Sequence, residues 1–125
     1  MLIFGIALAG AAGALARWGL GQAALAFGAT SFPYGTLSAN LIGCFLLGLV
    51  LGASERAAWM GGELRTILAV GFIGALTTFS TWEYETARLA RRGDPLLAAA
   101  NFAVNVFFGY LVLWAGGRLA ATLWR

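Results

Sequence analysis

The charged residues of this chain separate four apolar stretches, each long enough to cross a membrane as a helix. The hydrocarbon core of a bilayer is about 30 Å thick, and a helix needs about 20 residues to span it. Only 10% of the 125 residues are charged and 61% are hydrophobic, so a soluble fold could not cover its surface. The sequence therefore predicts an all-α integral membrane protein with a single four-helix domain over residues 1–125. The four predicted helices cover residues 2–26, 35–54, 65–87 and 95–118.

The first and the fourth predicted helices each contain a local sequence signal. The first contains Ala14-Leu15-Ala16, which resembles a signal-peptidase site, but it lacks the basic residues that open a signal peptide. We therefore expect it to be retained as a membrane helix. Asp94 and Pro95 predict the start of the fourth helix, because aspartate is a common N-cap and proline suits the first turn.

Composition excludes several classes of function. Histidine is absent and Cys44 is the single cysteine. Haem sites with a histidine ligand, zinc sites that use histidine, and Ser-His-Asp catalysis are therefore excluded, as is an intrachain disulfide. The net charge of +3 comes from arginines at the ends of apolar stretches, with no basic patch for nucleic acid. We expect neither an enzyme nor a nucleic-acid-binding protein.

The arginines are divided evenly between the two sides of a four-helix membrane protein. One side holds both termini and the second loop, with Arg56, Arg65, Arg118 and Arg125. The other side holds Arg17, Arg88, Arg91 and Arg92. Membrane orientation normally follows an excess of arginine and lysine on one side. A chain without that bias can insert in both orientations and can form an antiparallel dimer.

Small residues recur at four-residue spacing on the first two predicted helices. The repeats are Gly5-Ala9-Gly13, Ala39-Gly43 and Gly48-Gly52. Such repeats let helix backbones approach each other closely in lipid. Because four helices alone leave little room for a protected pathway, we also expect the chain to dimerise.

Three asparagines lie inside the predicted membrane helices. Asn40 is in the middle of the second helix, with Thr36 one turn earlier, and Asn101 and Asn105 share a face of the fourth. One such residue is most simply explained by a hydrogen bond between helices. Together with the hydroxyls of the third helix, the three asparagines indicate a shared polar pathway.

The chemistry of these polar groups favours a small anion. Amide and hydroxyl groups donate hydrogen bonds, and the edges of aromatic rings are electropositive. Phe79 and Trp82 are three residues apart, so they point the same way on a helix, although packing against lipid also explains an aromatic residue here. The only carboxylates within the third helix are Glu83 and Glu85, near its end. Neutral donors with aromatic edges suit a small, hard anion that has lost its water.

The third predicted helix also contains weak helix formers in mid-span. Gly71, Gly74 and Thr77-Thr78 all lower helix propensity. A break there would free backbone carbonyls, which can bind a cation when they are shielded from lipid. Glycine and threonine are also ordinary residues in membrane helices, so an unbroken helix remains the alternative.

Four stretches together resemble the Fluc (CrcB-type) fluoride channels over essentially the whole chain. They are GAAGALARWGLG, YGTLSANLIGCFLLG, GFIGALTTFSTWEYE and NFAVNVFFGYLVLWAGG. The second and third are the specific ones, because polar identities and glycine spacing match along many positions. The resemblance implies an antiparallel, dual-topology homodimer in the cytoplasmic membrane, with two fluoride pores and a central structural Na⁺. It implies passive export of fluoride.

The resemblance also implies roles for individual residues. Asn40, Phe79 and Trp82 would line the fluoride pathway, followed by Ser80, Thr81 and Glu85, and Asn101 and Asn105 would continue it on the fourth helix. Gly74 and Thr77 would bind Na⁺ through their backbone carbonyls, in a third helix broken in mid-membrane. Arg17 would lie at the aqueous vestibule and raise the local concentration of anions.

The chain departs from the family pattern at two places. Trp82 stands where phenylalanine is the familiar residue, which keeps an aromatic edge and adds bulk and an N–H donor. Asn101 and Asn105 stand where a tyrosine or a hydroxyl side chain is expected, and Asn105 can still donate to an anion.

Two other functions remain alternatives on the sequence alone. A small multidrug exporter has a similar size and dual topology, but it uses a carboxylate in the first helix, where this chain has Arg17 and no acidic residue. A non-transporting four-helix assembly subunit would explain the glycines and leave Asn40 and the hydroxyls of the third helix without a purpose.

Overall fold

The computed structural model describes residues 1–28 and 30–125, and these contain helices and no strand. The elements are α1 (Leu2–Ala26), α2 (Tyr34–Ser54), α3 (Gly62–Thr66), the π-helical segment η1 (Ile67–Ile73), α4 (Gly74–Leu76), α5 (Phe79–Arg91) and α6 (Pro95–Leu123). Within the described residues, α1, α2, the region Gly62–Arg91 and α6 are long and apolar enough to cross a membrane. The prediction of an all-helical chain with four long apolar helical segments is therefore confirmed.

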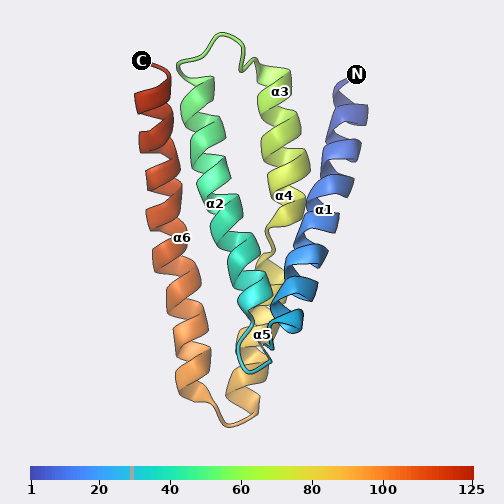
Figure 1. Ribbon diagram of the computed structural model, residues 1–125, viewed down its shortest axis with the longest axis vertical. Coiled ribbons are helices and arrows are strands. Elements are labelled where there is room, and N and C mark those ends of the chain that lie inside the picture. Colours follow the sequence, from blue (N-terminus) through green and yellow to red (C-terminus); the bar gives the residue numbers. More distant parts are fainter. Residues whose placement is uncertain (29) are drawn as a thin grey trace.

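The helices run alternately up and down (Figure 1). Both termini and the α2–α3 connection lie at one end of the molecule, and the α1–α2 and α5–α6 connections lie toward the other. Helix α2 is central, since it packs against α6 and also contacts α1, η1 and α4, while α1 packs mainly on η1. Each membrane-length segment is thus antiparallel to its neighbour in sequence.

Several helix ends differ from the sequence-based boundaries. α3 begins at Gly62 and α5 runs to Arg91, whereas the prediction covered residues 65–87. α6 continues past Arg118 to Leu123. Arginine is a good helix former whose long side chain can reach polar surroundings from within a helix, so an arginine does not end one. Asp94 occupies the N-cap position before Pro95, but its side chain makes no capping hydrogen bond.

Glycines allow the closest helix contacts, as the small-residue repeats predicted. A β-carbon on Gly13 would overlap the Phe72 carbonyl, which brings α1 against η1. A β-carbon on Gly48 would overlap the Leu113 carbonyl, which brings α2 against α6. The backbones touch because there is no side chain between them. The predicted role of these glycines in packing is confirmed.

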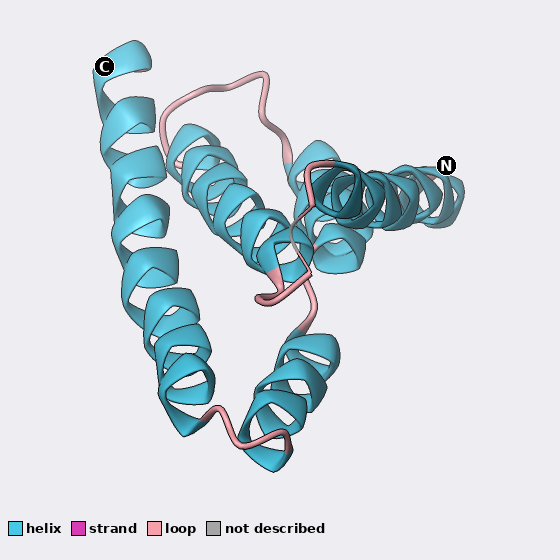
Figure 2. Cartoon of the chain, turned by 60° about the horizontal axis from the view of Figure 1, so that its bottom comes forward, coloured by secondary structure: helices cyan, strands magenta, loops and turns pink. Residues whose placement is uncertain are grey.

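The helical path of the third membrane segment is interrupted at Thr77 and Thr78. Thr77 has ψ 158°, and Thr78 has φ −152° and ψ 119°, so both are extended. Gly74, which the sequence predicts to be part of the break, is helical, with φ −61° and ψ −33°, and lies outside it. Helix α5 then starts in a new direction beside the beginning of α6 (Figure 2). The Thr78 hydroxyl caps α5 by accepting from the Thr81 N–H at 3.2 Å.

One chain by itself leaves large apolar side chains uncovered, especially on α1 and α6. On α6 the exposed residues include Phe107, Phe108, Tyr110, Leu111 and Trp114. Lipid tails or other apolar helices are the environments that suit such faces.

We predict that Gly48→Ala destabilises the protein by about 1–3 kcal/mol, because the added methyl group forces α2 away from α6. The matched control is Gly19→Ala on α1, where a β-carbon would meet no atom within 4 Å. Alanine favours a helix more than glycine does, so the control should be neutral or stabilising. Thermal unfolding of both variants in detergent is the measurement, and equal melting temperatures would contradict the role assigned to Gly48.

Candidate functional site

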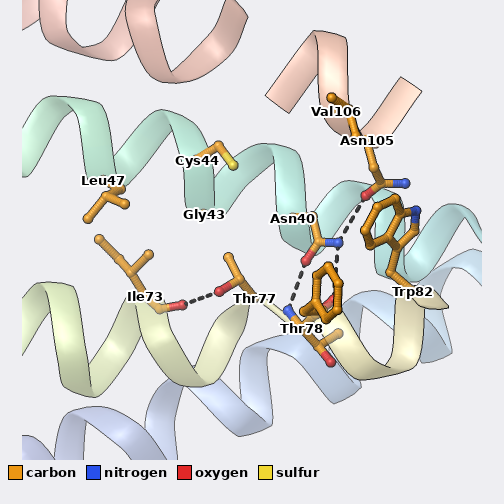
Figure 3. A pocket seen from close by; sticks show the side chains of 11 residues that line it. Asn40, Gly43, Cys44, Leu47, Ile73, Thr77, Thr78, Trp82, Asn105 and Val106 are labelled. Carbon is orange, nitrogen blue, oxygen red and sulfur yellow. Dashed lines mark hydrogen bonds between the residues drawn. The ribbon is translucent and has the colours of Figure 1, made fainter. Parts of the chain in front are cut away.

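The side chain of Asn40 on α2 binds the backbone at the interruption. The Thr78 N–H donates to Asn40 Oδ1 at 2.9 Å, and Asn40 Nδ2 donates to the Thr78 carbonyl at 3.3 Å. In a continuous helix the Thr78 N–H would donate to the carbonyl of Gly74 instead. Asn40 therefore replaces a helix hydrogen bond with contacts to both backbone groups of one residue, as Figure 3 shows.

The three asparagines form one hydrogen-bonded chain across the molecule. Asn40 Nδ2 donates to Asn105 Oδ1 at 2.9 Å, and Asn105 Nδ2 donates to Asn101 Oδ1 at 3.1 Å. Asn101 Nδ2 then donates to Thr86 Oγ1 at 2.8 Å. The hydroxyl of Thr86 in turn donates to the carbonyl of Trp82 at 2.8 Å. The chain connects α2, α6 and α5.

Backbone groups at both ends fix the direction of this chain. At one end Thr78 offers an N–H, which can only donate, so Asn40 must turn its oxygen toward it. At the other end Trp82 offers a carbonyl, so the Thr86 hydroxyl must donate to it and accept from Asn101. Both ends require the same orientation of all three carboxamides. Aligned hydrogen bonds of this kind polarise and strengthen one another.

Two aromatic residues stand beside the asparagine chain. Trp82 is buried, and its Nε1 donates to the Asn101 carbonyl at 3.1 Å. Its ring stacks on Phe102 with a centroid distance of 5.4 Å. Phe79 meets the Trp82 ring edge-on at 5.3 Å and is itself 70% exposed. The extra N–H of tryptophan is thus used for a contact between α5 and α6.

These groups surround a cavity of about 280 Å³ (Figure 3). Its lining is Asn40, Gly43, Cys44, Leu47, Ile73, Thr77, Thr78, Phe79, Trp82, Asn105 and Val106. Among these described residues there is no charged side chain. The structure therefore brings four residues of the predicted fluoride pathway, Asn40, Phe79, Trp82 and Asn105, to one neutral and largely apolar cavity, which Thr77 of the predicted Na⁺ site also lines.

A second cavity of about 270 Å³ is more polar, and residues of the α1–α2 connection contribute to its lining. Thr36, Glu85, Arg88 and Arg92 are among its lining residues, together with Gln22 of α1. Within the described part of the chain, the buried Oε2 of Glu85 and the buried Nε of Arg88 have no hydrogen-bond partner. Buried polar atoms of this kind are usually satisfied by water or by an ion.

The remaining predicted residues lie elsewhere. Ser80 and Thr81 are exposed in the first turn of α5. Asn101 is fully buried behind the first cavity and is not one of its lining residues. Arg17 is half-buried on α1 and belongs to the described lining of neither cavity. Sequence reasoning missed Thr86, although its position four residues after Trp82 places both on one face of α5.

The interruption also changes the surroundings of two backbone carbonyls. The Thr78 N–H, which would normally donate to the Gly74 carbonyl, donates to Asn40. The Thr81 N–H, which would normally donate to the Thr77 carbonyl, donates to Thr78 Oγ1. Both carbonyls of the predicted Na⁺ site are therefore released from the helix hydrogen bonds that residues four positions later would provide.

The chain matches one family of proteins over the region that contains both cavities. The sequence profile of the family described as "CrcB-like protein, Camphor Resistance (CrcB)" matches residues 4–117. That range includes all the residues of both cavities.

Several proteins are similar over nearly their whole length. A protein of Geobacter sp. (strain M21) is 46% identical over 118 residues, which are 94% of this chain and 95% of that protein. A protein of Geobacter metallireducens is 45% identical over 116 residues, 93% of this chain and 94% of that protein. A protein of Geobacter sulfurreducens is 42% identical over 121 residues, 97% and 98% of the two chains. All three carry the name "Fluoride-specific ion channel FluC".

We predict that Thr86→Val destabilises the protein by about 1–3 kcal/mol, because it leaves the buried amide of Asn101 without its acceptor. The matched control is Thr122→Val on α6, an exposed threonine whose hydroxyl also donates to a local helix carbonyl. That variant should change stability by less than about 0.5 kcal/mol. Unfolding of the two variants in detergent gives the comparison. If they are equally stable, the asparagine chain does not hold α5 against α6.

Proposed function

Since the chain belongs to the CrcB-like family, with relatives named fluoride-specific ion channels, we propose that it is a channel that passes fluoride across a membrane. Members of this family are ion channels and not enzymes, and the same holds for this chain. The observation that carries the proposal is the neutral cavity at the interruption, where Asn40, Asn105, Phe79 and Trp82 meet. Hydrogen-bond donors and ring edges suit a small anion without its water.

The cavities give the proposed path two different environments. The polar cavity near Glu85 holds Arg88 and Arg92, and their positive charge would raise the local concentration of anions. The cavity at Asn40 is neutral and largely apolar, so an anion that enters it loses water and needs donors in return. Ser80 and Thr81, exposed on α5, are the hydroxyls that would serve an anion outside this cavity.

We propose that the path is passive and that the channel lies in the cytoplasmic membrane. Fluoride that enters a cell as HF in acidic surroundings would leave down its own gradient, which lowers its toxicity. Nothing in this proposal requires an energy source, because the path consists of fixed donors and cavities.

An antiparallel homodimer with two pores is the assembly we propose. The two ends of the molecule carry four arginines each, so neither orientation in the membrane is favoured. The exposed apolar faces of α1 and α6 offer surface for a second copy and for lipid. Arg17 lines neither cavity of one subunit, and the proposal that it stands at the aqueous vestibule therefore depends on the dimer.

We further propose that the dimer holds a structural Na⁺ at its centre. The carbonyls of Gly74 and Thr77 fit this role, because both are released from their normal helix hydrogen bonds at the interruption. Oxygen atoms of unwound backbone are suitable ligands for Na⁺ in membrane proteins. Two carbonyls from each subunit would then share the ion.

The alternative function, a non-transporting four-helix assembly subunit, explains less of the structure. An assembly subunit would need the glycine contacts, but not a cavity lined by two asparagines and two aromatic rings. The small multidrug exporter is a different family from the one to which this chain belongs.

Purified protein in liposomes tests the proposal. We predict that trapped fluoride leaves these liposomes rapidly, as followed with a fluoride electrode, while trapped chloride stays inside. Asn40→Asp should abolish most of this flux, because a carboxylate beside the cavity repels an anion where the local dielectric constant is low. It also loses the amide donors of Asn40.

Gly61→Ala, in the α2–α3 connection, is the control that should retain full flux, because a β-carbon there would meet no atom within 4 Å. Absence of fluoride flux from well-folded protein would overturn the proposed function. Comparable chloride flux would overturn its selectivity, and normal flux from Asn40→Asp would show that Asn40 only packs.

A further inference from the structure

The backbone carbonyl of Asn101 receives more hydrogen-bond donors than it can fully accept. Trp82 Nε1 donates to it at 3.1 Å, and Asn105 Nδ2 donates to it at 3.0 Å. As a residue inside α6, Asn101 also accepts the helix hydrogen bond from the Asn105 backbone N–H. A carbonyl oxygen has two lone pairs, so three donors must share them.

Three donors on two lone pairs weaken one another, and the Asn105 side chain is the one donor of the three that has another acceptor. The helix bond belongs to a long ladder in α6, and the Trp82 ring is held by its stack on Phe102 and its contact with Phe79. Asn105 Nδ2 has a second acceptor, Asn101 Oδ1 at 3.1 Å, for its other hydrogen. One N–H of Asn105 is therefore bound only weakly by the protein.

Other donors around the cavity are committed. Asn40 Nδ2 donates to Asn105 Oδ1 at 2.9 Å, in the directional chain, and to the Thr78 carbonyl at 3.3 Å, in the pair of bonds that holds the interruption. The second contact is long, but its loss would leave the Thr78 carbonyl without the partner that Asn40 supplies. The Thr77 hydroxyl donates to the Ile73 carbonyl at 3.0 Å. The Trp82 N–H faces Asn101, so it does not offer itself to an anion in the cavity. The weakly bound N–H of Asn105, a cavity-lining residue, is then the donor that costs least to release.

We infer that Trp82 is a positioning residue for fluoride conduction: its indole N–H occupies the Asn101 carbonyl and so makes one Asn105 N–H available to the anion. This inference rests on the proposed function and concerns how its site works. Trp82 and Asn105 act as a pair, because the indole changes the donor strength of a neighbouring amide without touching the ion through its own N–H.

The test replaces Trp82 by 3-benzothienylalanine, an isostere in which sulfur stands in place of the N–H. The ring keeps its size and its contacts with Phe79 and Phe102, while the bond to the Asn101 carbonyl is lost. Asn105 Nδ2 then binds that carbonyl without competition. We expect initial fluoride efflux at low fluoride concentration to fall about tenfold, the effect of losing one hydrogen bond to a charged ligand.

A second readout does not depend on flux. In asparagine-labelled protein, nuclear magnetic resonance of the side-chain amides should show one Asn105 proton moving downfield in the isostere, as its bond to Asn101 strengthens. Trp82→Phe should give the same shift. The matched control is Trp59→Phe in the α2–α3 connection, an exposed tryptophan outside the faces assigned to the dimer, which should alter neither the shift nor the flux.

The outcomes separate this inference from the proposed function. If the unmodified protein passes fluoride and the isostere passes it within about twofold of the same rate, the positioning role of Trp82 is overturned. An unchanged Asn105 proton in both Trp82 variants overturns it as well. If the unmodified protein passes no fluoride, the proposed function fails, and the amide shift alone then decides whether Trp82 competes with Asn105.

Discussion

The pair of hydrogen bonds between Asn40 and the backbone of Thr78 is the interaction on which the site depends. A membrane helix cannot leave backbone groups unsatisfied in hydrocarbon, so an interruption needs a partner from elsewhere in the protein. A side-chain amide is the partner with the right chemistry, because it offers an acceptor for the N–H and a donor for the carbonyl. Asn40 supplies both from a neighbouring helix.

Several features follow because Asn40 replaces a hydrogen bond of the helix. Helix α5 can take a new direction, which brings Phe79 and Trp82 to the cavity beside α2 and α6. The orientation of Asn40 is fixed by the backbone, and through it the orientations of Asn105 and Asn101. A chain of amides that is already oriented costs little reorganisation when an anion arrives, which suits the proposed fluoride path. The asparagines thus serve structure and site together.

Much of this arrangement could be predicted from the sequence, because it follows from local patterns. The spacing of charges gives the four membrane segments, and small residues give the helix contacts. The site was harder to predict, since the position of the interruption depends on a contact between residues 40 and 78. The burial of Asn101 and the role of Thr86 depend on how α5 meets α6, which no local pattern encodes. Arg118 misled the prediction of the last helix end, because an arginine can remain within a helix.

In the proposed channel, oriented asparagine amides replace the water of the anion, with an N–H of Asn105 as the donor that reaches it. Solid-state nuclear magnetic resonance of asparagine-¹⁵N protein in bilayers with fluoride tests it most directly, through the dipolar coupling between ¹⁹F and the side-chain nitrogens. We predict a coupling to the side-chain nitrogen of Asn105 that corresponds to about 3 Å, the length of a hydrogen bond. Bound fluoride that does not couple to Asn105 would contradict this arrangement.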